Sequence, residues 1–391
     1  STLPEQNKYL TVSEKRKKLR EQKKHKKEKK EKLKSKYPPE SVTQSLLDHY
    51  QNGRFNDAEK LAVSITQEFS RYQLAWTLLG AIMGQSGRNS EAVNAFQTAV
   101  KLSPQDASAH NNLGVTLKEL GRLEDAEASY TKAIAFKPDL AEAHNNLGNT
   151  YKELGRLEAA ETSYSQAILL QPDYAEAHSN LGNTLQELGR LEEALASYTQ
   201  AIALKSDYAE AHSNLGNTLQ ELGRLDEALA SYTQAIALKP DYAEAHSNLG
   251  ITLEELGRLE EALASYTQAI ALKPDFAQAH NNLGNTLKEL GRLDEAETIY
   301  TQAIALKADF AEAHYNLGNT LRELGRLDEA EASYTQVIAL KPDYAQAHNK
   351  LLDCLFLQDK KSVFFDELDY LISQDKANST IGSLACRSAL K

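Results

Sequence analysis

The chain has 391 residues, 41% of them hydrophobic, and two cysteines, Cys354 and Cys386. This composition is typical of a folding chain in a reducing compartment, for which we expect the cytoplasm, and it argues against a disulfide scaffold. No apolar run approaches the roughly 20 residues that a membrane-spanning helix needs, and the N-terminal residues lack the apolar core of a signal peptide. The sequence therefore predicts neither a membrane span nor secretion.

The net charge of −11 is divided unevenly along the chain. Residues 1–37 carry fifteen Lys and Arg against five Glu, a net charge of +10, so the remaining residues carry −21. Between residues 15 and 36 the large apolar residues are Leu19 and Leu33 alone, too few to bury one face of a helix. We therefore expect residues 1–38 to form a basic, solvated N-terminal extension.

Histidine recurs every 34 residues along most of the remaining chain, and the surrounding pattern moves with it: His110, His144, His178, His212, His246, His280, His314 and His348. Residues 175–208 and 209–242 differ at only two positions. Such near-identity indicates recent internal duplication. We therefore expect the residue type at most positions to be determined by the stacking of the repeated units.

Each 34-residue unit has the apolar spacing of two helices. In residues 141–174, the first predicted helix carries His144, Leu147 and Tyr151 on one face and ends before Gly155. The second helix, which Pro172 ends, has an inner face made of Leu157, Ala160, Tyr164, Ala167 and Ile168. Gly148 and Ala160 are small enough to let the two helices approach closely. The unit therefore predicts an antiparallel helical hairpin.

This unit resembles the tetratricopeptide repeat (TPR), whose small and large positions are matched by Leu147, Gly148, Ala160, Tyr164, Ala167 and Pro172. It departs from the family early in the first helix, where His144 replaces a common aromatic residue that only Trp76 keeps. The resemblance implies an all-α fold, a right-handed α-solenoid of stacked 34-residue helix-turn-helix hairpins behind the basic extension. It also implies that the first helices line a concave groove.

Eight units match this pattern: residues 73–106, 107–140, 141–174, 175–208, 209–242, 243–276, 277–310 and 311–344. Residues 39–72 and 345–378 look like degenerate units, which we expect to cap the two ends of the array because a terminal unit lacks one neighbour. The C-terminal cap is expected to turn five apolar residues toward the last hairpin, namely Phe364, Phe365, Leu368, Leu371 and Ile372. Residues 379–391 form a tail.

Asparagine recurs at two sites of the first helix. The first asparagine row consists of Asn112, Asn146, Asn180, Asn214, Asn248, Asn282 and Asn316. The second asparagine row lies three residues further along the same face and consists of Asn149, Asn183, Asn217, Asn285 and Asn319. Val115 and Ile251 interrupt the second row. We expect both rows to lie at exposed sites in the groove.

Asparagine within a helix costs a few tenths of a kcal/mol per residue, which a function should offset. A primary amide offers a donor and an acceptor, so it can bind a peptide backbone whatever the side chains of the peptide. The rows also resemble the asparagine ladder in the TPR arm of O-linked N-acetylglucosamine transferase, which implies a groove that holds extended peptides. The alternative interpretation is that the asparagines pack between adjacent hairpins and were copied by duplication.

Charged residues flank these rows. Glutamates recur early in the first helices as Glu142, Glu176, Glu210, Glu244 and Glu312, and late as Glu153, Glu187, Glu221, Glu255, Glu289 and Glu323. The pattern favours a protein or an extended peptide that is neutral or basic, and disfavours nucleic acid along the array because phosphates would meet carboxylates. An ordinary solvated face is the alternative. Nonspecific contact between nucleic acid and the basic extension stays open.

The repeating histidines do not predict a metal site. Equivalent residues on neighbouring hairpins should be about 8–10 Å apart, whereas two imidazoles on one zinc need nitrogens within about 4 Å. No HExxH, CxxC, glycine-rich phosphate loop or GxSxG motif occurs. We therefore expect no catalytic residue, no metal and no cofactor in residues 1–391, and we interpret the histidines and the repeating tyrosines as structural.

Three hypotheses about function follow. The leading one is a protein–protein interaction scaffold, not an enzyme, that binds an extended peptide or partner protein in the groove through its asparagines. The second is a substrate-recruiting arm of a larger enzyme, since similar bacterial TPR arrays precede a glycosyltransferase, sulfotransferase or oxygenase domain. The third is a purely structural stacking element, which predicts no affinity for any peptide.

Overall fold

The computed structural model describes residues 17, 21, 23 and 37–373, and the fold of the described chain is all-α. Most of the predicted basic extension and the whole of the predicted tail at 379–391 lie outside these residues. The chain divides into two compact units, residues 1–188 and 189–391, which we call unit 1 and unit 2. No described helix is both long and apolar enough to cross a membrane.

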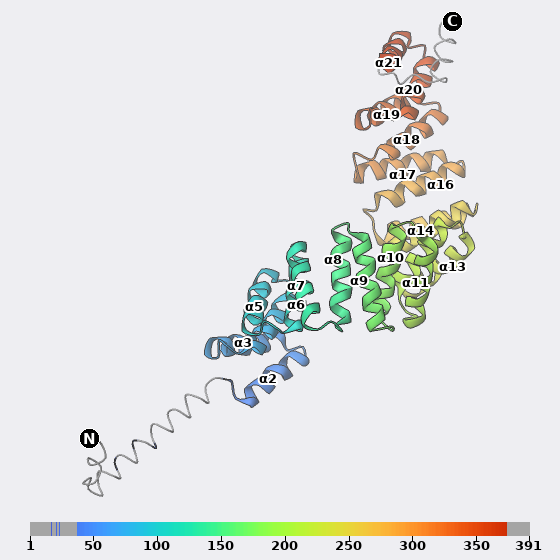
Figure 1. Cartoon of the computed structure of the whole chain (residues 1–391). Coiled ribbons are helices and arrows are strands. Elements are labelled where there is room, and N and C mark those ends of the chain that lie inside the picture. Colours follow the sequence, from blue (N-terminus) through green and yellow to red (C-terminus); the bar gives the residue numbers. More distant parts are fainter. Residues whose placement is uncertain (1–16, 18–20, 22, 24–36, 374–391) are drawn as a thin grey trace. The chain divides into compact units, whose positions relative to one another are not determined.

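Twenty helices make up the described part of the chain (Figure 1). Those of unit 1 are α2 (Glu40–Gln51), α3 (Phe55–Glu68), α4 (Gln73–Gln85), α5 (Asn89–Leu102), α6 (Ala107–Glu119), α7 (Leu123–Phe136), α8 (Ala141–Glu153), α9 (Leu157–Leu170) and α10 (Ala175–Glu187). Those of unit 2 are α11 (Leu191–Leu204), α12 (Ala209–Glu221), α13 (Leu225–Leu238), α14 (Ala243–Glu255), α15 (Leu259–Leu272), α16 (Ala277–Glu289), α17 (Leu293–Leu306), α18 (Ala311–Glu323), α19 (Leu327–Leu340), α20 (Ala345–Leu357) and α21 (Lys361–Ser373). Within each unit they stack as antiparallel hairpins, as the TPR pattern predicts.

The hairpin turn depends on one glycine per repeat. In the α8–α9 hairpin, Gly155 has φ +71°, a left-handed conformation that costs glycine nothing and costs other residues free energy. The N–H of Arg156 then donates to the carbonyl of Tyr151 over 2.8 Å, which satisfies one of the last carbonyls of α8. The predicted end of the first helix is confirmed, since α8 ends at Glu153.

In most hairpins, a glycine of the first helix packs against a tyrosine ring of the second helix. Tyr164 of α9 is fully buried, and a Cβ atom placed on Gly148 of α8 would lie 2.6 Å from the Cε1 atom of that ring. No side chain fits at this distance, so the glycine is required by the approach of the two helices. The prediction that Gly148 allows close packing is therefore confirmed.

Neighbouring hairpins share their hydrophobic core. In unit 1, a single cluster contains Phe96 of α5, Leu117 of α6, Tyr130 of α7 and Leu147 of α8. First helices of successive hairpins also contact one another directly, as α6 does with α8 and α14 does with α16. This row of first helices carries both asparagine rows, so each unit presents them on one side of its stack.

The repeating histidines join each hairpin to the turn before it. His144 donates its Nε2–H to the backbone carbonyl of Pro138 over 3.1 Å, and His246 donates to Pro240 over 3.2 Å. A carbonyl in the turn after a helix has no partner within the helix, and the histidine supplies a donor for it. These bonds give the histidines the structural role that the sequence predicts.

The C-terminal hairpin differs partly from the expectation. Phe364, Leu368 and Leu371 of α21 are buried against the core around Leu352, as predicted. The prediction that Phe365 also faces inward is wrong, because its side chain is 40% exposed. The three buried residues follow at i, i+4 and i+7 and share one helix face, whereas a residue one step along points about 100° away.

Candidate functional site

The first asparagine row is less exposed than the sequence predicts. Six of its seven side chains are half-buried, and Asn282 is buried with 8% of its surface exposed. The expectation of exposed groove sites is therefore wrong in degree. The physical reason is that amides such as those of Asn146, Asn180 and Asn248 reach back toward the preceding hairpin and bond to it.

In unit 1 these bonds join asparagines of successive first helices. The Nδ2 atom of Asn146 donates to the Oδ1 atom of Asn111 over 3.2 Å, and Asn180 donates in the same way to Asn145 over 3.1 Å. Asn111 and Asn145 are buried residues that immediately precede first-row asparagines. The sequence analysis missed them, although an asparagine pair in the same helix was a visible signal.

Unit 2 contains the same kind of bond with a second acceptor. Asn248 donates to Oδ1 of Asn217 over 2.9 Å. Asn316 donates to Oδ1 of both Asn281 and Asn285, over 3.1 and 3.0 Å. First-row amides therefore act as donors between hairpins, which is the packing role that the alternative interpretation describes.

The second asparagine row accepts hydrogen bonds from the buried tyrosines. The hydroxyl of Tyr164 donates to Asn149 over 2.7 Å, and the hydroxyls of Tyr232, Tyr300 and Tyr334 donate to Asn217, Asn285 and Asn319. A buried hydroxyl without such a partner costs free energy. The tyrosine–asparagine bonds lie within one hairpin, whereas the asparagine–asparagine bonds join successive hairpins. Together we call them the inter-hairpin network.

The network changes where the second row is interrupted. Ile251 offers no acceptor, and the hydroxyl of Tyr266 instead donates to the carboxylate of Glu254 over 2.7 Å. Thr286 of the next hairpin donates to the other oxygen of Glu254 over 2.5 Å. Burial raises the pKa of Glu254, and these two hydrogen bonds oppose that rise. At the other interruption, Val115, the hydroxyl of Tyr130 is buried without a partner among the described residues.

Charged residues late in the first helices bridge successive hairpins. Lys118 pairs with Glu153 over 2.8 Å, and Lys152 with Glu187 and Lys288 with Glu323 over 3.0 Å each. Two glutamates equivalent to Glu153 face no such donor, because the preceding first helix carries Gly84 or Glu254 where the other matching repeats carry Lys, Arg or Gln. They are Glu119 and Glu289, and within the described part of the chain neither has a cation at ion-pair distance.

Early glutamates are mostly engaged as well. Glu142 accepts from Asn111 over 3.0 Å, and Glu244 pairs with Lys273 over 2.9 Å. The free negative charge on the first helices is therefore smaller than the sequence suggests. Over residues 37–373, no group of three or more His, Cys, Asp and Glu side chains is arranged to hold a metal ion.

Comparisons with known proteins agree with this fold. The model of the family described as the cilia and flagella-associated protein 70 C-terminal domain matches residues 56–282. A tetratricopeptide-repeat model matches residues 281–345 and 315–375. A search of curated proteins found no match.

Solved TPR structures are also similar. The Cut9–Hcn1 hetero-tetramer of the APC/C is 18% identical over 77% of this chain and 59% of its own, with a TM-score of 0.52, which supports the fold alone. PilF of Pseudomonas aeruginosa is 20% identical over 54% of this chain and 96% of its own, with a TM-score of 0.49. YrrB, described as a TPR protein with an unusual peptide-binding site, is 28% identical over 48% of this chain and 96% of its own, with a TM-score of 0.41.

Proposed function

The chain belongs to the family of the cilia and flagella-associated protein 70 C-terminal domain, a TPR family, and from that premise we propose that it is a protein-binding scaffold that holds an extended peptide against its asparagine rows. The peptide or partner segment is neutral or basic. We assign no reaction to the scaffold itself.

The arrangement of the first-row amides supports this proposal best. Asn146, Asn180 and Asn248 each use one Nδ2 hydrogen to bond to the preceding hairpin. A primary amide has two N–H donors and one carbonyl acceptor, so the second N–H and Oδ1 remain for a peptide backbone. The bond to the preceding hairpin also restrains the amide, which lowers the entropy lost on binding.

The preference for a neutral or basic peptide rests on the unpaired carboxylates. Glu119 in unit 1 and Glu289 in unit 2 stand on the same helices as the first row, and Glu254 lies beside Glu289. A lysine or arginine of the peptide would give these groups the cation that they lack. Phosphates of a nucleic acid would be repelled at the same positions.

Replacing first-row asparagines tests the proposal. We expect the pairs Asn146→Ala with Asn180→Ala, and Asn248→Ala with Asn316→Ala, to weaken binding of peptides selected from a random library by about tenfold or more, since each lost hydrogen bond contributes about 0.5–1.5 kcal/mol. Fluorescence anisotropy with labelled peptides measures this affinity. Circular dichroism checks that the variants fold, which we expect because alanine regains helix propensity.

The matched control is Asn94→Ala, the same chemical change at an exposed site on the second helix α5. It should leave the affinity unchanged. Unaltered affinity in both first-row pairs would contradict peptide binding through these amides and would leave the inter-hairpin network as their whole role.

We also propose a reducing compartment such as the cytoplasm, supported by the free, buried thiol of Cys354. The namesake of the family is described as associated with cilia and flagella. Fluorescence imaging of a tagged full chain distinguishes a diffuse cytoplasmic location from a ciliary one.

A further inference from the structure

Helix α4 departs from the other first helices at the positions that carry the inter-hairpin network. Ala81 stands where the second asparagine row would continue, and Gly84 stands where the other matching repeats carry Lys, Arg, Gln or Glu. Phe96 of α5 replaces the repeating tyrosine and therefore has no hydroxyl. The α4–α5 hairpin therefore lacks three polar groups together: the second-row amide, the polar side chain at the position of Gly84 and the tyrosine hydroxyl.

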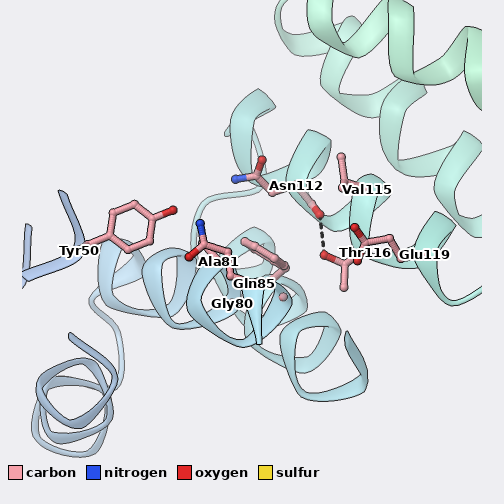
Figure 2. A pocket seen from close by; sticks show the side chains of 10 residues that line it. Tyr50, Gly80, Ala81, Gln85, Asn112, Val115, Thr116 and Glu119 are labelled. Carbon is pink, nitrogen blue, oxygen red and sulfur yellow. Dashed lines mark hydrogen bonds between the residues drawn. The ribbon is translucent and has the colours of Figure 1, made fainter. Parts of the chain in front are cut away.

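The space they leave is a cavity of about 310 Å³ between α4 and α6 (Figure 2). Its apolar lining includes Ala81, Phe96 and Val115, and Gly84 adds no side chain. A Cβ atom on Gly84 would meet nothing within 4 Å, so the cavity is open there. An engineered cavity of about 150 Å³ holds benzene, so this one has room for a leucine or phenylalanine side chain.

Polar groups lie around the cavity. The side chains of Tyr50, Gln85 and Asn112 converge on it in Figure 2. Asn112 is the first-row residue of α6. In the preceding first helix α4, Thr77 stands at the position of the acceptors Asn111 and Asn145, and Ala81 stands at the position of the acceptor Asn217. Its side-chain amide therefore makes none of the bonds that Asn146 and Asn180 make within the described part of unit 1. Glu119, also in the lining, has no cation at ion-pair distance among the described residues.

Two other clefts serve as a comparison. One is lined by Leu249, Leu253 and the Arg258–Glu261 ion pair, and the other by the residues 34 positions later. Because they recur at equivalent positions of successive hairpins, they follow from the spacing of the stack. The cavity at α4 instead arises from residues that differ from the repeat pattern.

We propose that this cavity receives a leucine or phenylalanine side chain of an extended partner peptide, while Asn112 binds the peptide backbone and Glu119 pairs with an adjacent lysine or arginine. The inference rests on the proposed function, of which it names the anchor and the sequence preference. The apolar lining matches the apolar side chain, and the unpaired carboxylate at its edge matches the basic neighbour.

The test uses the full chain and a displayed library of random octapeptides. The wild-type chain should enrich peptides with Leu or Phe next to Lys or Arg. Synthetic peptides with that pair should bind about tenfold or more tightly than versions with Ala in place of the apolar residue. Fluorescence anisotropy gives both affinities.

Two variants separate the apolar and the charged contact. Ala81→Leu fills the cavity and should abolish the preference for Leu or Phe. Glu119→Gln removes the charge without adding a side chain to the cavity and should abolish only the preference for the basic residue. Glutamine and glutamate have similar helix propensities, so this variant keeps its fold.

The outcomes distinguish the two proposals. Retention of the Leu or Phe preference by Ala81→Leu overturns the anchor, and so does a wild-type selection without that preference. If the Asn146→Ala, Asn180→Ala pair then still weakens binding, the proposed function stands without the anchor. A library that yields no binding peptide for the wild-type chain overturns both.

Discussion

The Tyr266 hydroxyl donates its hydrogen bond to the Glu254 carboxylate, whereas Tyr164 and Tyr232 donate to asparagines. Ile251 has removed the asparagine acceptor, and Glu254 provides the replacement from the next turn of α14. The replacement satisfies a fully buried tyrosine but places a partly buried charge beside Glu289. Burial consequently raises the pKa of Glu254.

We expect Glu254→Gln to raise the thermal stability of the chain at neutral pH. Gln220 already occupies the equivalent position one hairpin earlier and accepts from Tyr232 and Thr252, so glutamine fits the site without a charge. Thermal unfolding followed by circular dichroism measures the difference from the wild-type chain.

The thermal stability gained by Glu254→Gln should become smaller as the pH falls. The pKa of Glu254 in the folded chain is raised above its value in the unfolded chain, so the burial penalty is complete above the folded pKa. It shrinks as pH falls through the folded pKa and vanishes below the unfolded one. A gain that persists undiminished into acid would show that it arises from something other than this carboxylate.

We expect Tyr130→Phe to stabilise the chain and Tyr164→Phe to destabilise it. The hydroxyl of Tyr130 is buried without a partner in the described chain, whereas that of Tyr164 bonds to Asn149. Each change should shift the free energy of unfolding by about 1 kcal/mol, in opposite directions. Urea unfolding measures both, and equal losses of stability in the two variants would contradict the unsatisfied hydroxyl.

A pair of glycines on equivalent helices should respond oppositely to alanine. At Gly148 the new methyl group would lie 2.6 Å from Cε1 of Tyr164, and we expect a loss of about 1–3 kcal/mol from overpacking. At Gly84 the methyl group meets nothing within 4 Å, and the higher helix propensity of alanine should add about 0.5–1 kcal/mol. Urea unfolding distinguishes the two, and a stabilising Gly148→Ala would disprove the close approach.

The thiol of Cys354 should be inert in the folded chain. Burial raises its pKa to about 11, so the reactive thiolate is scarce at pH 8. In a Cys386→Ser background, Ellman's reagent should modify Cys354 slowly in buffer and rapidly in urea. Rapid modification of the native chain would mean that the last hairpins open readily.

Much of the fold follows from the sequence because the residues that determine each hairpin lie within a single 34-residue repeat. The spacing of Leu147, Tyr164 and Gly155 predicts two helices and their turn, and 34-residue repetition predicts their stacking. Phe365 was misplaced because five apolar residues in a short helix exceed what one face can bury.

The candidate site was less predictable. The spacing locates the asparagines on the first helices but does not give the direction in which each amide points, which depends on the neighbouring hairpin. Val115 and Ile251 were visible as interruptions, yet their effects differ. The hydroxyl of Tyr266 donates to Glu254, whereas the hydroxyl of Tyr130 has no acceptor among the described residues. The residue equivalent to Glu254 in that hairpin is Lys118, which is not an acceptor and extends to Glu153.

The irregular positions have a consequence for how a partner aligns. Similar amides recur every 34 residues, so a uniform array would bind a peptide almost equally well after a slip of one hairpin. At the position of Gly84 and Glu254, the other six of the eight matching 34-residue repeats carry Lys, Arg or Gln. Gly84, in unit 1, is the single glycine at this position, and Glu254, in unit 2, is the single carboxylate. Each residue makes its own repeat different from the other repeats in the same half of the chain. A peptide that uses either position is held in one register, and repeats that are nearly identical in sequence become distinguishable to it.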